Sequence, residues 1–341
     1  MFEMAAASET AGQNLATIYE WGLTFIHIFQ AGGNPVLTAA ARFFTLLGDP
    51  VAYLVILPIL FWCVDEKRGF TLGVTVLLSN GINVAVKEAL RVPRPFILDP
   101  TVQMIHAEGF STPSGHSQNS AVLWPLLLRK PSTRPSFPVS RLVPALLLPS
   151  CIGLSRIYLG VHYPTDVLLG WTIGAVIVAT ALFAPKTAVF RKISDAVQKY
   201  TATSGRSLKS LKLGAAALVT IVLNATNNSD SSMGGAFFGF SAGYILLNEK
   251  TKTDTPQKHF SAETGSWAQK TLRLVAGVGV LGLLYAGLKK IFPGEESAYY
   301  TLFRFLRYGI IGFWASYGAP ALFMKTGLAP QNIKEQPTSV S

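Results

Sequence analysis

Three clusters of polar residues lie at the edges of long apolar runs, and they hold the side chains of this chain that are best suited to chemistry. Charged groups beside such runs are energetically costly, so their presence there indicates function. Together they supply three cations, two histidines and one carboxylate, which is the equipment for binding a phosphate group and breaking its ester bond. Their members are Lys87 and Arg94, then Ser114, Gly115 and His116, and finally Arg156, His162 and Asp166.

In the first cluster, Lys87 and Arg94 are seven residues apart, which is two helical turns. Pro93 and Pro95 are expected to end that helix and to hold Arg94 in an extended conformation near its tip. A lysine and an arginine placed in this way suit a phosphate, because one offers a point charge and the other a planar fork of donors. The alternative is that such cations only snorkel at a membrane boundary, and for Arg91 both interpretations stay open.

The second cluster, Pro113-Ser114-Gly115-His116, directly precedes an apolar helix. Glycine permits close approach of the backbone, and the free N–H groups of a helix start attract phosphate oxygens. Ser114 can add a hydroxyl donor. His116 is placed for proton transfer, because the ordinary histidine pKa of about 6.5 suits protonation of a leaving alkoxide. Taken alone, this cluster would indicate only a helix N-cap.

In the third cluster, His162 and Asp166 are four residues apart, and Pro164 lies between them at a favourable first-turn position of the next span. The carboxylate can therefore fold back onto His162, fix its tautomer and stabilise its cationic form. Arg156 adds a third phosphate ligand. A lone His–Asp pair is more often structural, so the functional interpretation depends on all three clusters together.

The composition indicates a membrane protein. Half of the 341 residues are hydrophobic, 14% are charged and the mean hydropathy is +0.37, which is too apolar for an ordinary soluble domain. A further run, 15–30, either crosses the membrane or lies along its surface, so we expect about nine or ten helical spans. The other apolar runs are 51–63, 70–86, 117–128, 142–154, 165–184, 213–223, 234–247, 272–288 and 306–323.

The net charge of +11 is distributed unevenly among the connecting loops. Basic residues gather at 129–141, 186–212 and 250–273, whereas the alternate loops 224–232 and 293–299 contain none. The positive-inside rule therefore places the basic loops in the cytoplasm, with anionic lipid headgroups as partners instead of nucleic acid. The same parity places the three polar clusters on the opposite, periplasmic or extracytoplasmic face. We expect a bacterial inner membrane protein.

The three clusters resemble the type 2 phosphatidic acid phosphatase superfamily, which contains lipid phosphate phosphatases and vanadium haloperoxidases. Its pattern is Lys, six residues, Arg-Pro; then Pro-Ser-Gly-His; then Ser-Arg, five residues, His, three residues, Asp. The chain meets every element at this spacing between Lys87 and Asp166. The resemblance covers about 51–184, and the chain beyond about Lys212 lies outside it.

This resemblance implies a role for each residue. His162 would attack phosphorus and form a phosphohistidine, Asp166 would orient its far ring nitrogen, and His116 would protonate the departing oxygen and later activate water. Three cations and the second cluster would bind the nonbridging oxygens, and no metal or other cofactor is expected, because these cations already neutralise the phosphoryl group. The oxygen-binding residues are Lys87, Arg94, Ser114, Gly115 and Arg156.

We therefore predict an all-α, polytopic transmembrane helical bundle with a six-helix phosphatase core and about four extra C-terminal spans. The core would occupy 1–185, a basic cytoplasmic linker 186–212 and an accessory membrane region 213–341. In that last region, Gly234, Gly235, Gly239 and Gly243 predict close helix packing. The oligomeric state is not predicted.

The predicted function is that of an integral membrane phosphatase for a lipid phosphomonoester or a polyprenyl diphosphate. The alternatives are a lipid-to-lipid phosphotransferase that uses the same site, and a non-catalytic lipid transporter or binding protein. Several substrates stay open, namely polyprenyl (undecaprenyl) diphosphate, phosphatidate, phosphatidylglycerophosphate and sphingoid-base phosphate.

Overall fold

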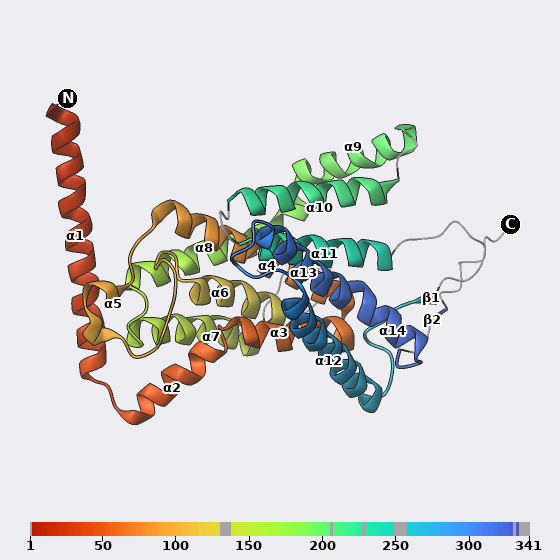
Figure 1. Ribbon diagram of the computed structural model, residues 1–341, viewed down its shortest axis with the longest axis horizontal. Helices are drawn as coiled ribbons and strands as arrows, with labels where there is room; N and C mark the ends of the chain where they lie inside the picture. Colours follow the sequence, from red (N-terminus) through yellow and green to blue (C-terminus); the bar gives the residue numbers. More distant parts are fainter. Residues whose placement is uncertain are drawn as a thin grey trace. The chain divides into compact units, whose positions relative to one another are not determined.

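The computed structural model describes residues 2–129, 138–204, 207–226, 230–248, 258–329 and 332–333, and nearly all its regular structure is helical (Figure 1). Within these ranges the strands are β1 (Lys258–His259) and β2 (Asn332–Ile333), which pair antiparallel. The predicted all-α membrane bundle is confirmed. Five of the basic residues expected in the cytoplasm lie outside the described residues, namely Lys130, Arg134, Arg206, Lys250 and Lys252.

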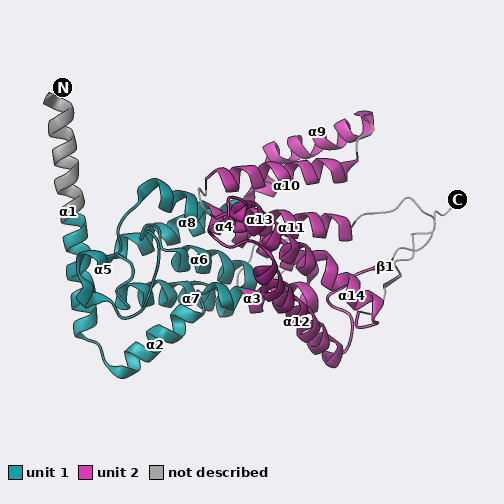
Figure 2. Cartoon of the chain, viewed as in Figure 1, with its two compact units in different colours: residues 1–53, 82–182 teal, residues 54–81, 183–341 magenta. Residues whose placement is uncertain are grey.

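The chain folds into two compact units (Figure 2). The first contains Met1–Tyr53 and Ile82–Leu182, and the second contains Leu54–Gly81 and Phe183–Ser341. All three polar clusters lie in the first unit. The division of the chain at 185 and 212 stays a prediction.

The helices of the first unit carry the polar clusters at their ends. They are α1 (Phe2–Ala31), α2 (Pro35–Leu46), α5 (Pro95–Leu98), η2 (Pro100–Val102), α6 (Gly115–Leu128), α7 (Val139–Tyr158) and α8 (Pro164–Phe183). Two further segments contribute to both units, namely α3 (Pro50–Ile59) and α4 (Glu66–Leu90), and the last residue of α8, Phe183, belongs to the second unit. The second unit holds η1 (Leu60–Val64), η3 (Ala184–Lys186), α9 (Ala188–Ser204), α10 (Leu208–Ala225), α11 (Ser232–Leu247), α12 (Trp267–Ile291), α13 (Tyr300–Phe313), η4 (Trp314–Gly318) and α14 (Ala319–Lys325).

Local sequence determines where these helix ends fall. Helix α4 stops at Leu90, because Arg91 adopts the left-handed region at φ 49° and two prolines follow. Helix α6 begins after Ser114, whose Oγ accepts a hydrogen bond from the backbone N–H of Ser117. Helix α8 begins at Pro164, which lacks the N–H that a first turn leaves unused. The clusters therefore stand at the C-terminal ends of α4 and α7 and the N-terminal ends of α6 and α8.

All the apolar runs identified in the sequence are helical, but fewer of them than expected have the length and hydropathy of a membrane span. Among the described residues four helices qualify, and the bent segment formed by α2, α3 and η1 makes a possible fifth, against nine or ten expected. The physical reasons are local: α6 and α11 have only 14 and 16 residues, and η4 interrupts the last run. The four helical spans are Glu66–Leu98, Pro164–Lys186, Leu208–Ala225 and Trp267–Ile291.

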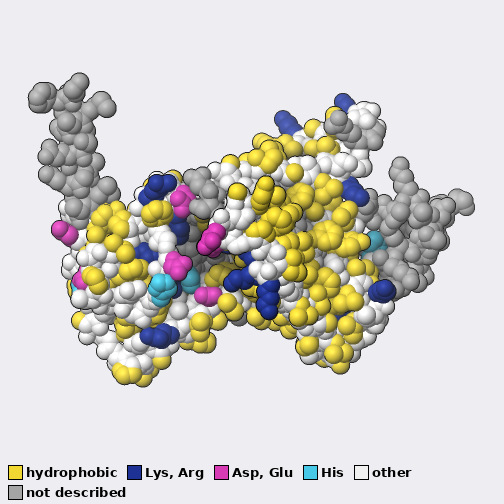
Figure 3. All heavy atoms as spheres, in the orientation of Figure 1, with side chains coloured by type: hydrophobic (Ala, Val, Ile, Leu, Met, Phe, Trp, Pro, Cys, Tyr) yellow, Lys and Arg dark blue, Asp and Glu magenta, His cyan; other side chains and the backbone are white. Residues whose placement is uncertain are grey.

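Large apolar side chains are exposed on these helices, as expected for surfaces that face lipid. On α12, Val275, Leu283 and Ile291 are 64%, 74% and 78% exposed. Figure 3 shows hydrophobic side chains over much of the visible surface. Since no water surrounds such a face in a bilayer, its exposure costs nothing there.

Glycines of α11 permit close packing against α10, α13 and η4, which confirms the prediction from their spacing. A Cβ on Gly235 would overlap the carbonyl oxygen of Phe305, and one on Gly239 would overlap that of Gly309. The second unit also buries Arg273 completely. Its guanidinium donates to the carbonyl oxygens of Trp62, Ala262, Thr264 and Leu328 at 2.6–3.2 Å, which joins three stretches of chain.

Gly239→Ala should lower the free energy of unfolding by about 1–3 kcal/mol, because the added methyl group meets backbone that cannot rotate away. Thermal unfolding in detergent measures this. The matched control is Gly282→Ala in α12, where a Cβ meets nothing within 4 Å, and its melting temperature should be unchanged or slightly higher. Equal melting temperatures for the two variants would contradict the packing argument.

Candidate active site

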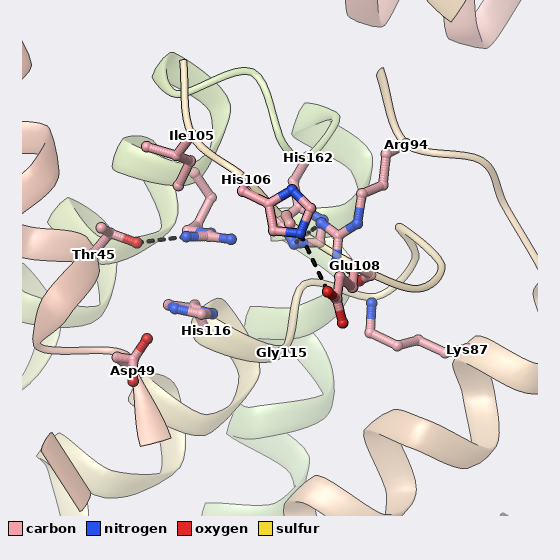
Figure 4. Close-up of a pocket in the computed structure, with 12 residues that line it drawn as sticks. Thr45, Asp49, Lys87, Arg94, Ile105, His106, Glu108, Gly115, His116 and His162 are labelled. Atoms are coloured by element: carbon pink, nitrogen blue, oxygen red, sulfur yellow. Dashed lines mark hydrogen bonds and ion pairs between the residues drawn. The ribbon is translucent and has the colours of Figure 1, made fainter. Parts of the chain in front are cut away.

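The first unit encloses a cavity of about 310 Å³ where the four helix ends meet (Figure 4). Six of the eight predicted site residues line it, namely Lys87, Arg94, Gly115, His116, Arg156 and His162. The other two, Ser114 and Asp166, are fully buried and act on residues of the lining. The rest of the lining comprises Thr45, Asp49, Ile105, His106, Ala107 and Glu108.

Asp166 is held by donors on several sides and faces His162. Its Oδ2 lies 3.3 Å from His162 Nδ1 and accepts from the Tyr163 backbone N–H at 2.8 Å and from Ser111 Oγ at 2.5 Å. Thr112 Oγ1 donates to the other carboxylate oxygen. These contacts keep the carboxylate ionised and fix its direction, so that it can orient the His162 ring.

The opposite nitrogen of His162 faces a cation. Arg94 Nη1 lies 3.2 Å from His162 Nε2. Because a guanidinium can only donate, Nε2 is the acceptor, and the ring proton belongs on Nδ1, where Asp166 accepts it. The ring is therefore the Nδ1–H tautomer, in which Nε2 carries the lone pair that a nucleophile needs.

Two of the three cations are held by backbone carbonyl groups. Lys87 Nζ donates to the carbonyl oxygens of Phe110 and Ser111 at 2.5 and 3.0 Å. Arg94 donates to those of Glu108, Gly109 and Val161 at 2.6–2.9 Å. Carbonyl dipoles satisfy these donors without cancelling their charge, so the cavity keeps a positive potential.

Arg156 is held by a hydroxyl group. Its Nη1 donates to Thr45 Oγ1 at 2.6 Å. Its buried Nε has no hydrogen-bond partner within the described chain.

The second cluster forms the first turn of α6. Gly115 and His116 reach the cavity, whereas Ser114 does not line it and instead caps the helix. A Cβ on Gly115 would lie 3.1 Å from Asn83 Oδ1, so the turn packs closely on α4. Asn83 Nδ2 in turn donates to the Pro113 carbonyl oxygen at 3.3 Å. The structure thus brings Gly115 and His116 to the cavity and gives Ser114 a supporting position.

Several residues of the site were missed in the sequence. Ser111 and Thr112 bind Asp166, Asn83 supports the start of α6, and Thr45 binds Arg156. The position of Ser111 and Thr112, immediately before the Pro-Ser-Gly-His run, was the available signal. Nothing in the sequence marks Thr45, because it comes from a helix distant in the chain.

Burial lowers the pKa of His162 from its ordinary value of 6.5 to about 3. The hydrogen bond and charge of Asp166 oppose this shift, and Arg94 and Lys87 reinforce it. The imidazole is therefore neutral at neutral pH, and its Nε2 is unprotonated.

Comparison with known proteins gives two matches to one family. Residues 68–189 match the PAP2 superfamily, and residues 231–331 match the description "PAP2 superfamily phosphatase, transmembrane extension". The first match includes all eight site residues. The second shows that the resemblance reaches further than the sequence motifs indicated, into the region beyond Lys212.

Curated relatives are lipid phosphatases by name. Sphingosine-1-phosphate phosphatase 2 of Mus musculus is 32% identical over 40% of this chain and 40% of its own length. Phosphatidylglycerophosphatase B of Bacillus subtilis is 33% identical over 30% of the chain and 52% of its own length. The chain thus spans about half the length, or less, of these two relatives. Decaprenylphosphoryl-5-phosphoribose phosphatase of Mycolicibacterium smegmatis is 30% identical over 40% of the chain and 73% of its own length.

One solved structure is also similar, the transmembrane PAP2 type phosphatidylglycerolphosphate phosphatase from Bacillus subtilis. It has 24% sequence identity and a TM-score of 0.41, and the alignment covers 48% of this chain and 84% of that one.

The depressed pKa of His162 makes stability depend on pH. As the pH falls from about 6.5 toward 3, this histidine binds a proton in the unfolded chain but not in the folded chain. The stability that is present above pH 6.5 is therefore progressively lost. The glutamine of His162→Gln cannot titrate. When the pH is lowered from 7 to 4.5, the free energy of unfolding of this variant should therefore fall by about 2–3 kcal/mol less than that of the unmodified protein. Thermal unfolding at several pH values measures this. His27→Gln, at a half-exposed histidine, is the control, and parallel pH profiles for all three proteins would refute the prediction.

Proposed function

Because this chain belongs to the PAP2 superfamily, we propose that it is an integral membrane phosphatase that hydrolyses a lipid phosphomonoester or a polyprenyl diphosphate. The observation that carries the proposal is the pair of His162 and Asp166 on a cavity lined by three cations, one of which, Arg94, contacts the ring nitrogen that Asp166 leaves unprotonated. A nucleophile, a carboxylate that orients it and fixed positive charge are the groups that phosphoryl transfer requires.

In the first proposed step, His162 Nε2 attacks phosphorus, and the bond from phosphorus to the lipid oxygen breaks. His116, protonated, gives its proton to that oxygen, so that an alcohol leaves instead of an alkoxide. Lys87, Arg94 and Arg156 stabilise the charge on the nonbridging oxygens, assisted by the N–H groups at the start of α6 beside Gly115. Ser114 serves this step by capping that helix.

In the second step, water attacks the phosphohistidine. Neutral His116 takes the proton from water, the bond between phosphorus and Nε2 breaks, and inorganic phosphate leaves. Asp166 stabilises His162 throughout. The three cations provide the charge neutralisation that a metal ion would otherwise supply, so the proposed mechanism needs no metal.

The substrate class is proposed from the relatives, whose names share a phosphate ester on a lipid. Because the lipids in these names differ, we propose only that the substrate carries a phosphate ester. The lipid part is to be identified by measuring phosphate release from a panel of substrates. Sphingoid-base phosphate, phosphatidylglycerophosphate, phosphatidate and polyprenyl diphosphate form that panel.

The mechanism predicts that His162→Ala lowers phosphate release at least ~10³-fold, because the nucleophile is lost. His116→Ala should instead form a phosphoenzyme from an aryl phosphate, whose leaving group needs no proton, and should accumulate it. Phosphate release and acid-labile, base-stable phosphoenzyme are measured with the purified protein in detergent. His27→Ala, outside the cavity, is the matched control.

The same assay distinguishes the alternatives. Substantial phosphate release by folded His162→Ala protein would reject the nucleophile, and loss of activity with a chelator that magnesium or zinc restores would reject metal independence. Transfer of phosphate to a second lipid without release would indicate a phosphotransferase. A protein that binds the lipids and transforms none of them would be a transporter or binding protein.

We also propose that the protein lies in a bacterial inner membrane with its site on the periplasmic face and its basic segments on anionic lipid of the cytoplasmic leaflet. Helix α9 supports this, since none of its residues is buried. Its apolar residues Val189, Phe190 and Ile193 are exposed, and its basic residues include Arg191 and Lys192. A basic amphipathic helix of this kind lies in the membrane interface, where anionic headgroups attract it.

Thiol labelling tests this sidedness. Single cysteines at Glu108, on the cavity lining, and at Gln198, on α9, are placed in a variant that lacks Cys63 and Cys151. A membrane-impermeant reagent applied to spheroplasts should label position 108 and spare position 198. The reverse pattern would reject both the periplasmic site and the cytoplasmic lipid partner of α9.

A further inference from the structure

A carboxylate on the cavity wall has no part in the mechanism above. Asp49, in the turn between α2 and α3, lines the cavity together with His116. Figure 4 shows its carboxylate turned toward the imidazole of His116, which in this view lies between Asp49 and His162. The other acidic residue of the lining, Glu108, has a side chain that is 88% exposed and paired with His106. Asp49 is therefore the acidic side chain of the lining that is placed to act on His116.

The backbone holds this turn against the histidine. Gly48 is buried, and a Cβ at this position would lie 3.1 Å from His116 Cδ2 and 2.6 Å from Ile152 Cγ2. A side chain there would push the turn away from the ring. Asp49 Oδ1 accepts a hydrogen bond from the Val51 backbone N–H at 2.9 Å, which caps α3. The cap fixes the carboxylate and leaves its second oxygen for the cavity.

His116 lacks the fixed partner that His162 has. His162 Nδ1 lies 3.3 Å from Asp166 Oδ2, whereas neither ring nitrogen of His116 hydrogen-bonds to another group in the described part of the chain. Burial lowers the pKa of His116, and the charges of the three cations that share the cavity lower it further. A general acid must nevertheless carry its proton when substrate is bound. A carboxylate on the side of the ring away from the substrate would offset the repulsion.

We propose that Asp49 is a positioning residue for His116, which it orients toward the leaving oxygen and stabilises as the imidazolium. The inference rests on the proposed phosphatase function. As the bond from phosphorus to the lipid oxygen breaks, His116 passes its proton to that oxygen and becomes neutral, and Asp49 stays ionised. As the bond from phosphorus to His162 breaks in the second step, His116 recovers a proton from the attacking water. The site then contains two pairs of histidine and carboxylate, one for the nucleophile and one for proton transfer.

Asp49→Asn in the full-length protein tests this, since the amide oxygen of asparagine can still cap α3. We measure kcat/KM, which reports the first chemical step, for a long-chain alkyl phosphate and for p-nitrophenyl phosphate. The alkoxide needs the proton of His116 and p-nitrophenolate does not. We expect a loss of about 10- to 100-fold for the alkyl substrate and less than about 3-fold for the aryl substrate. The alkaline limb of the alkyl pH profile should also move to lower pH, because the imidazolium loses its stabilising charge.

The controls separate this role from a structural one. Asp99→Asn alters another aspartate N-cap of the first unit, outside the cavity lining, and should leave both substrates unaffected. Asp49→Asn added to His116→Ala should cost nothing further on the alkyl substrate. Equal losses on the two substrates would overturn the inference alone and would favour action through Arg156, whose charge Asp49 also stabilises. No loss on either substrate would likewise overturn the inference alone. An inactive unmodified protein would overturn the proposed function and the inference together.

Discussion

Mutual repulsion among three cations in one cavity is the constraint around which the first unit is organised. Lys87 and Arg94 meet this constraint with backbone carbonyl groups, which satisfy their donors and leave their charge in place. Carboxylates in the same positions would form ion pairs, and an incoming phosphate would have to displace them. The fully buried carboxylate beside the site, Asp166, is instead directed at His162. Positive potential and a neutral imidazole can therefore coexist within a few ångströms.

In the second unit, hydrogen bonds from a guanidinium to backbone carbonyl oxygens join segments of the chain. Arg273 is completely buried and donates only to carbonyl oxygens among the contacts described, from segments as distant in sequence as Trp62 and Leu328. Within the described residues no carboxylate pairs with it, and it does not line the cavity of the first unit. A buried guanidinium thus acts here as a structural junction. The difference between the two units lies in whether space remains beside the cation for a ligand.

Sequence reasoning predicted the parts of this structure that depend on local chemistry. The prolines after Leu90 and at 164, and the serine before α6, determine where helices stop and start, so the polar clusters could be placed correctly at helix ends. Fewer described helices than expected have the length and hydropathy of a membrane span, because apolar composition does not reveal the π turns at η1 and η4 or the shortness of α6. Thr45 and Asp49 were missed for another reason. They reach the cavity from α2 and the turn after it, and only the packing of α2 on α7 brings them there.

The loop before α6 is attached through its main chain, so the positions of the cations do not depend on which side chains the loop carries. Lys87 and Arg94 hold this loop through main-chain oxygens of Glu108, Gly109, Phe110 and Ser111. A main-chain oxygen is the same whichever side chain its residue carries. The side chains of Ile105, His106, Ala107 and Glu108, which line the cavity, can therefore diverge without loosening the cations. If the proposed function holds, changes in this rim would alter which phosphate ester enters the cavity, and the cations would keep their positions.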